Sequence, residues 1–274
     1  MPEGPEIRLA ADRVAKVLVG RPIAEVTFGL PALQRFERLL TGSTVTGVNT
    51  RGKAMLTRFD NGLTLYSHNQ LYGRWYTTRR PSFPKTNRSL RVALHTERHS
   101  ALLYSASDIE VLTDKQLSQH AFLGRIGPDI LAPELTVEQV AMRLESDRFR
   151  NRALASLYLD QSFLAGIGNY LRSEILWAAG VEPSRKPADL SSAKRNRIAR
   201  NTLQISRRSY RTRGVTVAPT LAARLKANGL TYRQRRFWVF GREGLSCHRC
   251  DTPIRRRSMG GRNIFVCSSC QPAD

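Results

Sequence analysis

Two pairs of cysteines near the end of the chain restrict its fold more than any other feature. Cys247 and Cys250 form one C-x-x-C pair, Cys267 and Cys270 form a second, and 16 residues separate the pairs. This spacing is typical of a zinc site with four thiolate ligands, in which each pair supplies two sulfurs from one tight turn. Four protein ligands leave no open coordination position, so the zinc would be structural. Two disulfides or a redox pair are the alternative.

The stretch between the cysteine pairs fits a β-hairpin. Residues 253–255 and 263–266 would be its strands, with a turn over 258–261. Because the module is short, it has little hydrophobic core of its own. The metal would therefore supply much of its folding free energy. The hairpin also carries four arginines, which are either a solvated basic face or contacts for nucleic-acid phosphates. We favour the second interpretation. The arginines are Arg255, Arg256, Arg257 and Arg262.

The net charge points to a polyanionic partner. The chain has 44 Lys and Arg against 22 Asp and Glu, and residues 185–274 alone hold 21 basic and four acidic residues. Such an excess opposes self-association and favours binding to a phosphate polymer, with an acidic membrane surface as the weaker alternative. No apolar run is long enough for a spanning helix, and the first residues are unlike a signal peptide.

The order of sequence patterns predicts an α+β fold. Residues 6–18 have helical spacing, and residues 20–112 are rich in short strands. Two strand pairs are expected there, 54–59 with 63–66 around Asp60-Asn61-Gly62, and 90–94 with 101–104. A helix starts after Thr136, with Gln139 completing a capping box. Further helices are expected over 152–160, 169–179 and 191–210, whereas 211–230 favours no single structure.

We therefore expect an N-terminal β-sandwich domain with an N-terminal helix, over residues 1–130. A helical domain would follow over 131–230, and the four-cysteine module would occupy 231–274. The two larger parts agree with the chain length.

The N-terminus combines an imino acid with two carboxylates. Removal of the initiator Met would leave Pro2 with a secondary amine. An α-amine has a pKa of about 8, so part of it is unprotonated at neutral pH. Such an amine can attack an electrophilic carbon and form an iminium. Glu3 or Glu6 could move protons beside it. On the residues alone, the start of a helix explains this segment more simply.

Three sections together resemble the formamidopyrimidine-DNA glycosylase/endonuclease VIII family. They are residues 1–6, residues 159–176 and the four-cysteine module, and they span essentially the whole chain in the family's order. Within that family the chain looks like the endonuclease VIII branch, because Gly4-Pro5-Glu6, Ser67-His68-Asn69-Gln70-Leu71-Tyr72 and Leu103-Tyr104-Ser105-Ala106-Ser107-Asp108 match it. The resemblance implies a helix–two-turn–helix domain that binds damaged duplex DNA.

The resemblance also implies a bifunctional glycosylase and AP lyase of base excision repair. Pro2 would attack C1′ of the damaged nucleotide, Glu3 would assist ring opening and base loss, and Glu6 would be a supporting proton shuttle. Lys53 matches the family lysine that supports β-elimination and contacts the lesion phosphate. Arg262 matches the hairpin arginine of δ-elimination. Residues in DNA-contacting positions are Gln70, Leu71, Tyr72, Arg125 and Asn169.

Two of these contacts have a physical rationale. Gln70, Leu71 and Tyr72 are of suitable size to fill the gap left by an extruded base. The free N–H groups at the start of helix 169–179, with the amide of Asn169, would bind a phosphate. The alternatives are strand-end core residues for Leu71 and Tyr72, an N-cap for Asn169 and an ordinary surface lysine for Lys53.

The expected substrates are oxidised pyrimidines. Residues 211–230, which often cover the everted base in this family, match it less well, so a formamidopyrimidine/8-oxoguanine enzyme is the first alternative. A non-catalytic DNA-binding protein on the same scaffold and a ribosome-associated zinc protein are others. We expect one zinc ion, a monomer and a location in the bacterial cytoplasm at the nucleoid.

Overall fold

The structure is a computed structural model that describes residues 2–273, and these fold into two compact units. The first contains Pro2 and residues 6–125, and the second contains residues 3–5 and the described residues from 126 onward. The second unit thus includes both the predicted helical domain and the predicted cysteine module. Within the described range, no helix has the length and apolar character needed to span a bilayer.

Helix α1 (Gly4–Leu18) confirms the predicted N-terminal helix and begins two residues earlier than expected. From residue 6 onward it belongs to the first unit. Its buried residues recur at helical spacing, and they join the main apolar core of this unit. They are Ile7, Ala10, Ala11, Val14 and Leu18.

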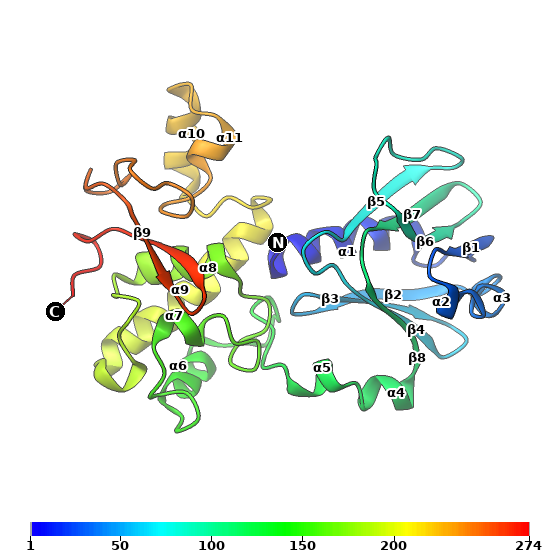
Figure 1. Cartoon of the computed structure of the whole chain (residues 1–274), viewed down its shortest axis with the longest axis horizontal. Helices are drawn as coiled ribbons and strands as arrows, with labels where there is room; N and C mark the ends of the chain where they lie inside the picture. Colours follow the sequence, from blue (N-terminus) through cyan, green and yellow to red (C-terminus); the bar gives the residue numbers. More distant parts are fainter. Residues whose placement is uncertain (1, 274) are drawn as a thin grey trace. The chain divides into compact units, whose positions relative to one another are not determined.

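Two antiparallel four-stranded sheets form the rest of this core, which confirms the predicted β-sandwich (Figure 1). One sheet has the order β1-β6-β7-β5 and the other β2-β3-β4-β8. The strands are β1 (Glu25–Phe28), β2 (Val45–Arg51), β3 (Ala54–Phe59), β4 (Leu63–His68), β5 (Arg74–Arg79), β6 (Leu90–His95), β7 (His99–Tyr104) and β8 (Asp108–Thr113). Both predicted strand pairs, β3–β4 and β6–β7, are present.

Four short helices complete the first unit: α2 (Pro31–Gln34), α3 (Glu37–Leu40), α4 (Asp114–Ser118) and α5 (Ala121–Arg125). The last two cover the second sheet below the sandwich in Figure 1. There Leu117 and Leu123 pack against the buried Leu56 and Tyr66. The pairing of β4 with β8 places His68 opposite Asp108, and this register shapes the loop that follows β4.

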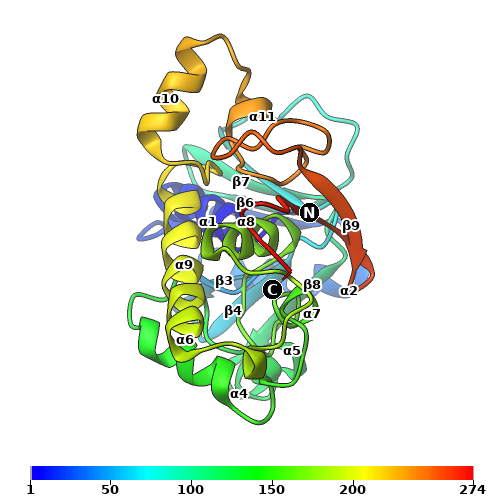
Figure 2. The same cartoon turned by 90° about the vertical axis from the view of Figure 1, so that its left-hand side faces the viewer.

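The second unit is helical, with a hairpin at its end. Its helices are α6 (Val137–Glu145), α7 (Leu154–Leu157), α8 (Asn169–Ala179), the 3-10 helix η1 (Pro187–Asp189), α9 (Ser192–Arg211), α10 (Pro219–Ala227) and α11 (Tyr232–Arg235). Thr136 and Gln139 form the predicted capping box of α6. Helices α8 and α9 pack together across a common apolar core (Figure 2).

The helix predicted over 152–160 is wrong in extent, because only α7 forms there. The first N–H groups of this stretch bond to distant carbonyl groups: Leu154 donates to Arg185 and Ala155 donates to Pro183. At the other end, the carboxylate of Asp160 accepts a hydrogen bond from the backbone N–H of Ser162, which turns the chain. The first two bonds therefore anchor the free N–H groups at the start of α7, and the turn at Asp160 follows its end.

The cysteine module contains the predicted hairpin, made of β9 (Arg255–Met259) and β10 (Arg262–Val266). Its turn is tighter than expected, since Gly260 and Gly261 alone connect the strands. Both have positive φ, 63° and 71°, as a two-residue turn of type I′ requires. The stretch that favoured no structure contains α10, which starts at Pro219, a residue suited to a first helical turn.

Candidate functional site

The carboxylate of Glu3 lies at the N-terminus of α8. Glu3 is 3% exposed, and its two oxygens accept hydrogen bonds from the backbone amides of Gly168 (2.7 Å), Tyr170 (2.8 Å) and Leu171 (3.2 Å). The N–H of Gly4 donates to the carbonyl of Gly166 at 2.8 Å. A negative group is favourable at this helix end, where the dipole is positive and backbone N–H groups lack partners.

Gly168 has no side chain because Glu3 occupies that space. A Cβ atom on Gly168 would lie 2.4 Å from the Cδ atom of Glu3. The predicted role of this turn therefore needs correction, because three of its N–H donors already bind a carboxylate of the chain itself. Phosphate binding at this helix end would depend mainly on the side chain of Asn169.

Arg172 fastens the hairpin to α8, and sequence reasoning missed it. Its side chain is fully buried, and its Nη1 donates to the carbonyls of Ala155 (2.8 Å) and Met259 (3.0 Å). Its Nη2 donates to Oδ1 of Asn169 (2.6 Å) and to the carbonyl of Asn263 (3.2 Å). Burial, followed by the nearby charge of Arg262, lowers the pKa of Arg172 to about 10, and Glu3 opposes this shift.

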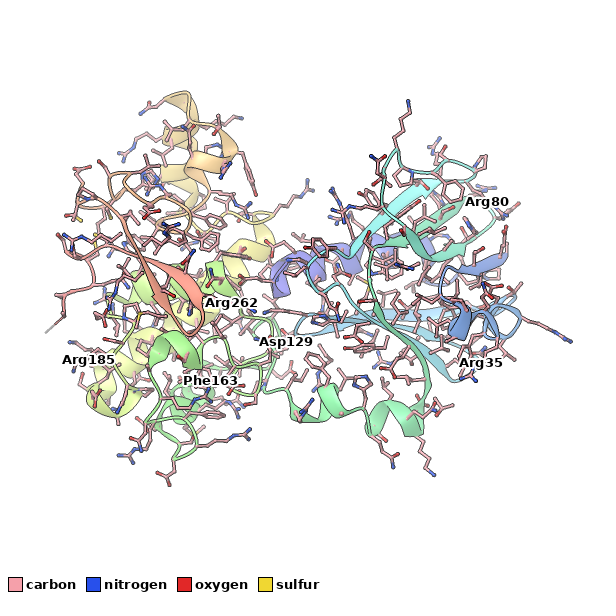
Figure 3. The ribbon with its side chains drawn as sticks, viewed as in Figure 1. Arg35, Arg80, Asp129, Phe163, Arg185 and Arg262 are labelled. Carbon is pink, nitrogen blue, oxygen red and sulfur yellow. The ribbon has the colours of Figure 1, made fainter. Side chains whose placement is uncertain are left out.

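The tip of the hairpin lies against the start of α8. The amide of Asn169 donates to the carbonyl of Asn263 at 2.7 Å, and Arg262 is exposed at the first position of β10 (Figure 3). A Cβ atom on Gly260 would lie only 3.2 Å from Oγ of Ser156. The second unit thus brings Glu3, Asn169 and the hairpin tip together around one helix end, although the sequence separates them widely.

Glu174 holds the two ends of the α10–α11 segment. It is fully buried, and its carboxylate accepts hydrogen bonds from the backbone amides of Trp238 (2.8 Å), Val239 and Phe240 (both 2.9 Å). The hydroxyl of Thr216 also donates to it. Burial raises the pKa of Glu174, and these four hydrogen bonds act in the opposite direction.

Asp160 stabilises the loop that precedes α8. It pairs with Arg152 and accepts a hydrogen bond from Ser162 N at 2.8 Å. Burial alone would raise the pKa of Asp160, but the hydrogen bonds from Arg152 and Ser162 outweigh it and lower the pKa. Asp160 therefore acts on the loop conformation.

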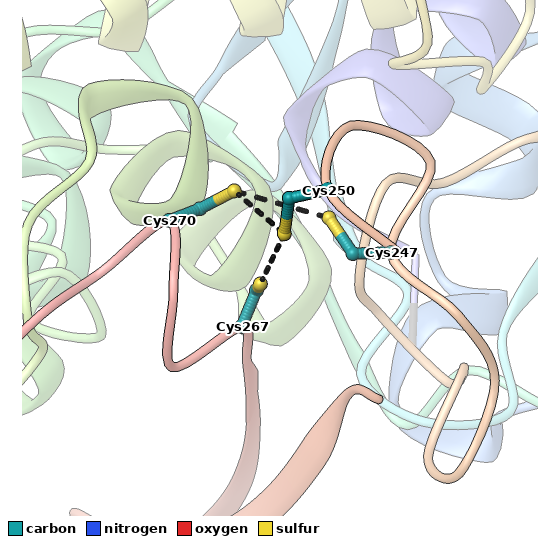
Figure 4. Close-up of side chains that lie close together, drawn as sticks. All are labelled: Cys247, Cys250, Cys267 and Cys270. Atoms are coloured by element: carbon teal, nitrogen blue, oxygen red, sulfur yellow. Dashed lines mark hydrogen bonds between the residues drawn. The ribbon is translucent and has the colours of Figure 1, made fainter. Parts of the chain in front are cut away.

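The four cysteine thiols converge on one point (Figure 4). Their Sγ atoms all lie within 4.8 Å of one another, and no disulfide joins them. Three of the separations are 3.4 Å for Cys250–Cys267, 3.6 Å for Cys250–Cys270 and 3.9 Å for Cys247–Cys270. This arrangement can hold a metal ion. Disulfides, the sequence alternative, are absent among these residues.

Lys53 belongs to the first unit and lies in the two-residue turn between β2 and β3. Gly52, its turn partner, has a positive φ of 61°. Lys53 is only 8% exposed, which excludes the ordinary surface lysine considered above. Pro2 is half-buried, and Glu6 lies in the first turn of α1.

The remaining predicted residues of the first unit are exposed. Gln70, Leu71 and Tyr72 form the loop between β4 and β5, where Leu71 is 58% and Tyr72 69% exposed. They are therefore not strand-end core residues. Arg125 ends α5, and its Nε donates to the carbonyl of Ala121 at 2.9 Å.

Two sequence models of one family match most of the chain. The formamidopyrimidine-DNA glycosylase N-terminal domain matches residues 1–107, and the formamidopyrimidine-DNA glycosylase H2TH domain matches residues 126–219. The first match lies almost entirely in the sandwich, and the second includes α6 to α9 and the loop before α8.

Curated relatives match over their full length. Endonuclease 8 from Escherichia coli O17:K52:H18 is 50% identical over 271 residues, and the Endonuclease 8 proteins of Salmonella agona and Klebsiella pneumoniae are 49% identical. Each match covers 99% of this chain and 100% of the relative.

Solved structures share the fold at much lower sequence identity. Lactococcus lactis formamidopyrimidine-DNA glycosylase bound to abasic-site DNA aligns with a TM-score of 0.80 and 19% identity, over 98% of this chain and 99% of that one. The complex of the same enzyme with DNA containing N7-benzyl-Fapy-dG aligns with a TM-score of 0.81 and 20% identity, over 99% of this chain and 100% of that one.

Proposed function

Because the chain belongs to the formamidopyrimidine-DNA glycosylase/endonuclease VIII family, we propose that it removes oxidised pyrimidines from duplex DNA through an iminium on Pro2 and cuts the strand by β,δ-elimination. It is a DNA glycosylase and AP lyase of this family, and damaged or abasic-site DNA is its partner. The observation that carries the mechanism is the anchoring of Glu3, since it fixes the residue next to the attacking amine.

The chemistry begins at Pro2 after removal of Met1, which lies outside the described residues. The unprotonated amine forms a bond to C1′ of the damaged nucleotide, and the base leaves with the electrons of the glycosidic bond and takes up a proton. The amine proton is lost and the C1′–O4′ bond opens, with O4′ taking up a proton, to give the iminium. Loss of a C2′ proton then expels the 3′ phosphate, and a second elimination expels the 5′ phosphate.

The supporting residues have separate roles. Glu3 delivers the proton for ring opening and base loss, and Glu6 assists proton movement. Lys53 supports β-elimination and binds the lesion phosphate. Arg262 binds phosphate during δ-elimination as a charge clamp, because a guanidinium keeps its proton at neutral pH.

DNA is held by residues from both units. Gln70, Leu71 and Tyr72 fill the gap left by the extruded base, and their exposure supports this role. Asn169 and Arg125 bind the backbone. Arg172 holds the side chain of Asn169 in place.

The metal is one structural Zn²⁺. In a tetrahedral site with Zn–S bonds of about 2.3 Å, neighbouring sulfurs lie about 3.8 Å apart. The separations of 3.4, 3.6 and 3.9 Å fit this geometry. Four thiolates also match the preference of zinc for sulfur ligands in structural sites. Cys247, Cys250, Cys267 and Cys270 would hold the ion, which when bound fixes the base of the hairpin.

Oxidised pyrimidines are the proposed substrates because the relatives that match over their full length are named Endonuclease 8. We further propose that the protein acts as a monomer in the bacterial cytoplasm at the nucleoid. Residues 1–130, 131–230 and 231–274 would be its catalytic domain, DNA-binding domain and zinc finger.

Borohydride trapping tests the mechanism. The wild type is expected to form a covalent adduct with duplexes that contain thymine glycol or dihydrouracil. Pro2→Gly, or retention of Met1, should abolish it. A parallel duplex with 8-oxoguanine opposite cytosine tests substrate choice, and a strong preference for that duplex would overturn it. Failure to trap any damaged duplex would refute the iminium mechanism.

A further inference from the structure

We propose that His68 and Ser107 are positioning residues that hold the Gln70-Leu71-Tyr72 loop in the shape needed to enter the DNA stack. The inference deepens the proposed function and depends on its role for this loop. All the contacts that support it lie within the first unit.

The loop is closed at its base and open at its tip. Asn69 is 6% exposed, and its carbonyl accepts a hydrogen bond of 2.7 Å from the N–H of Gly73. A Cβ atom on Gly73 would lie 2.6 Å from that same oxygen, so the closure requires glycine. Between these residues, Leu71 and Tyr72 are mostly exposed.

Gln70 gives the loop its bend. Its φ is +48°, in the left-handed region that residues with a side chain rarely adopt. Two hydrogen bonds hold it there. The N–H of Gln70 donates to Nδ1 of His68 at 3.2 Å, and the hydroxyl of Ser107 donates to Oε1 of Gln70 at 2.9 Å. One bond fixes the backbone and the other fixes the side chain.

Sheet register explains why these two residues meet the loop. Strands β4 and β8 are antiparallel, and His68 pairs with Asp108. The residue before Asp108 therefore lies beside the residues that follow His68. Ser107 reaches Gln70 for this reason, although 37 positions separate them.

His68 must present an unprotonated Nδ1 to act as an acceptor. Burial lowers the pKa of His68, the charge of Asp108 opposes this shift, and Lys53 reinforces it. The ring is also oriented by packing, because the ring of Phe122 lies edge-on at 5.5 Å between centroids. The neutral tautomer with its proton on Nε2 leaves Nδ1 able to accept the bond from Gln70.

The benefit of this arrangement is preorganisation. Two exposed apolar side chains would lower their free energy by folding onto the protein surface. A loop that is already held in its bent form loses less conformational entropy when it enters DNA. His68 and Ser107 should therefore affect the step in which the gap is filled, and leave elimination at an unpaired abasic site unaffected.

The test compares isosteric variants at His68. In His68→Asn, Oδ1 can take the place of Nδ1, whereas His68→Gln puts its terminal amide near the position of Nε2. Ser107→Ala removes the second bond. Ser118→Ala is the control, because the exposed hydroxyl of Ser118 donates to the carbonyl of Lys115 in its own helix turn. The readouts are fluorescence of 2-aminopurine beside the lesion in a duplex, and cleavage of a single-stranded abasic oligonucleotide.

We expect His68→Gln and Ser107→Ala each to reduce the rate of the 2-aminopurine change about fivefold, as for loss of one hydrogen bond. His68→Asn and Ser118→Ala should match the wild type, and all variants should cleave the single strand normally. The proposal would be overturned if His68→Gln and Ser107→Ala both gave the wild-type rate of 2-aminopurine change. It would also be overturned if these variants lost single-strand cleavage by the same factor as this rate. A wild type that gives the fluorescence change but no borohydride adduct would instead refute the proposed chemistry.

Discussion

The carboxylate of Glu3 accepts a 2.7 Å hydrogen bond from the backbone amide of Gly168, a residue 165 positions away in the sequence. The bond attaches the third residue of the chain to the helix that also binds the hairpin tip through Asn169 and Arg172. An attacking amine at Pro2 would be one residue from this anchor. Glu3 itself takes its position from a helix end within the second unit.

Replacing Glu3 by glutamine should separate the two activities. Glu3→Gln keeps the size and shape of the side chain but cannot transfer a proton. Its amide NH2 group also replaces one carboxylate oxygen and so faces backbone N–H donors that it cannot accept from. We expect base removal to fall about 100-fold or more. Cleavage of a preformed abasic site should fall much less, because that substrate has no base to lose. Gel assays on matched duplexes measure both, and equal losses would contradict the role of Glu3 in base loss.

A methyl group at Gly168 should displace Glu3 without unfolding the protein. The added Cβ of Gly168→Ala would overlap the end of the Glu3 side chain, which can move only by giving up its hydrogen bonds. We expect a loss of about 1–3 kcal/mol in the free energy of unfolding and a fall in base excision. Gly124→Ala is the control, because a Cβ there meets nothing within 4 Å. Wild-type excision by Gly168→Ala would show that the anchor is dispensable.

Removal of the Arg172 guanidinium should loosen the hairpin tip while the cysteines still bind metal. Arg172→Met removes the donor to the buried carbonyl of Ala155 and to the carbonyl of Met259, at a cost of about 1–3 kcal/mol for each. We expect the Arg172→Met variant to bind DNA more weakly than the wild type and still to contain one zinc ion per chain. Arg150→Met, which removes only an exposed pair with Asp147, should change stability by less than about 1 kcal/mol. Loss of zinc from Arg172→Met would place its effect at the cysteines instead.

Metal removal should be visible in tryptophan fluorescence. The rings of Trp177 and Trp238 stack at 4.3 Å, and Trp177 packs in one buried cluster with Cys247 and Cys267. A thiol-reactive mercurial should release one zinc per chain, change the emission of this pair and abolish tight DNA binding. Readdition of zinc after thiol reduction should restore both signals. Full DNA affinity in the metal-free protein would contradict a structural role for the ion.

Acidification should weaken the bond between the hairpin and the turn after α8. Burial alone would raise the pKa of Glu182, but hydrogen bonds from Ser184 and Arg257 outweigh it and lower the pKa below its usual 4.5. The native state then binds fewer protons than the unfolded state between these two pKa values. This part of the stability is complete above about pH 4.5 and is lost as the pH falls through the folded pKa.

The matched variant isolates this effect from the protonation of thiolates. Glu182→Gln cannot titrate, so its melting temperature should fall less steeply with decreasing pH than that of the wild type. Thermal melts from pH 7 to pH 3 measure both slopes. Parallel curves would show that Glu182 contributes nothing to acid sensitivity.

Local patterns in the sequence predicted the elements that depend on neighbouring residues. The capping box of Thr136 and Gln139, the hairpin around Asn61-Gly62 and the span of α8 are all determined within a few positions. The cluster of four cysteines was predictable for the same reason, because metal-ligand spacing is a local pattern.

Contacts between distant segments were not predictable in this way. Nothing near Glu3 indicates that it binds the start of α8. Its carboxylate takes three of the backbone N–H groups that were expected to be free for a phosphate. The short helix α7 is anchored at its start by the distant carbonyls of Pro183 and Arg185, which no local pattern indicates. Arg172 carried one signal, a charged residue inside a mostly apolar stretch, but its partners Met259 and Asn263 are far along the chain.

The bond between Glu3 and Gly168 also imposes an order of events on biosynthesis. At about 5–20 residues per second, a ribosome completes Gly168 about 10–30 s after Glu3. During that interval the start of the chain has no docking partner and stays open to aminopeptidases. Docking then buries Glu3, the residue beside the proposed nucleophile. The anchor beside the proposed nucleophile can therefore form only after more than half of the chain has been synthesised.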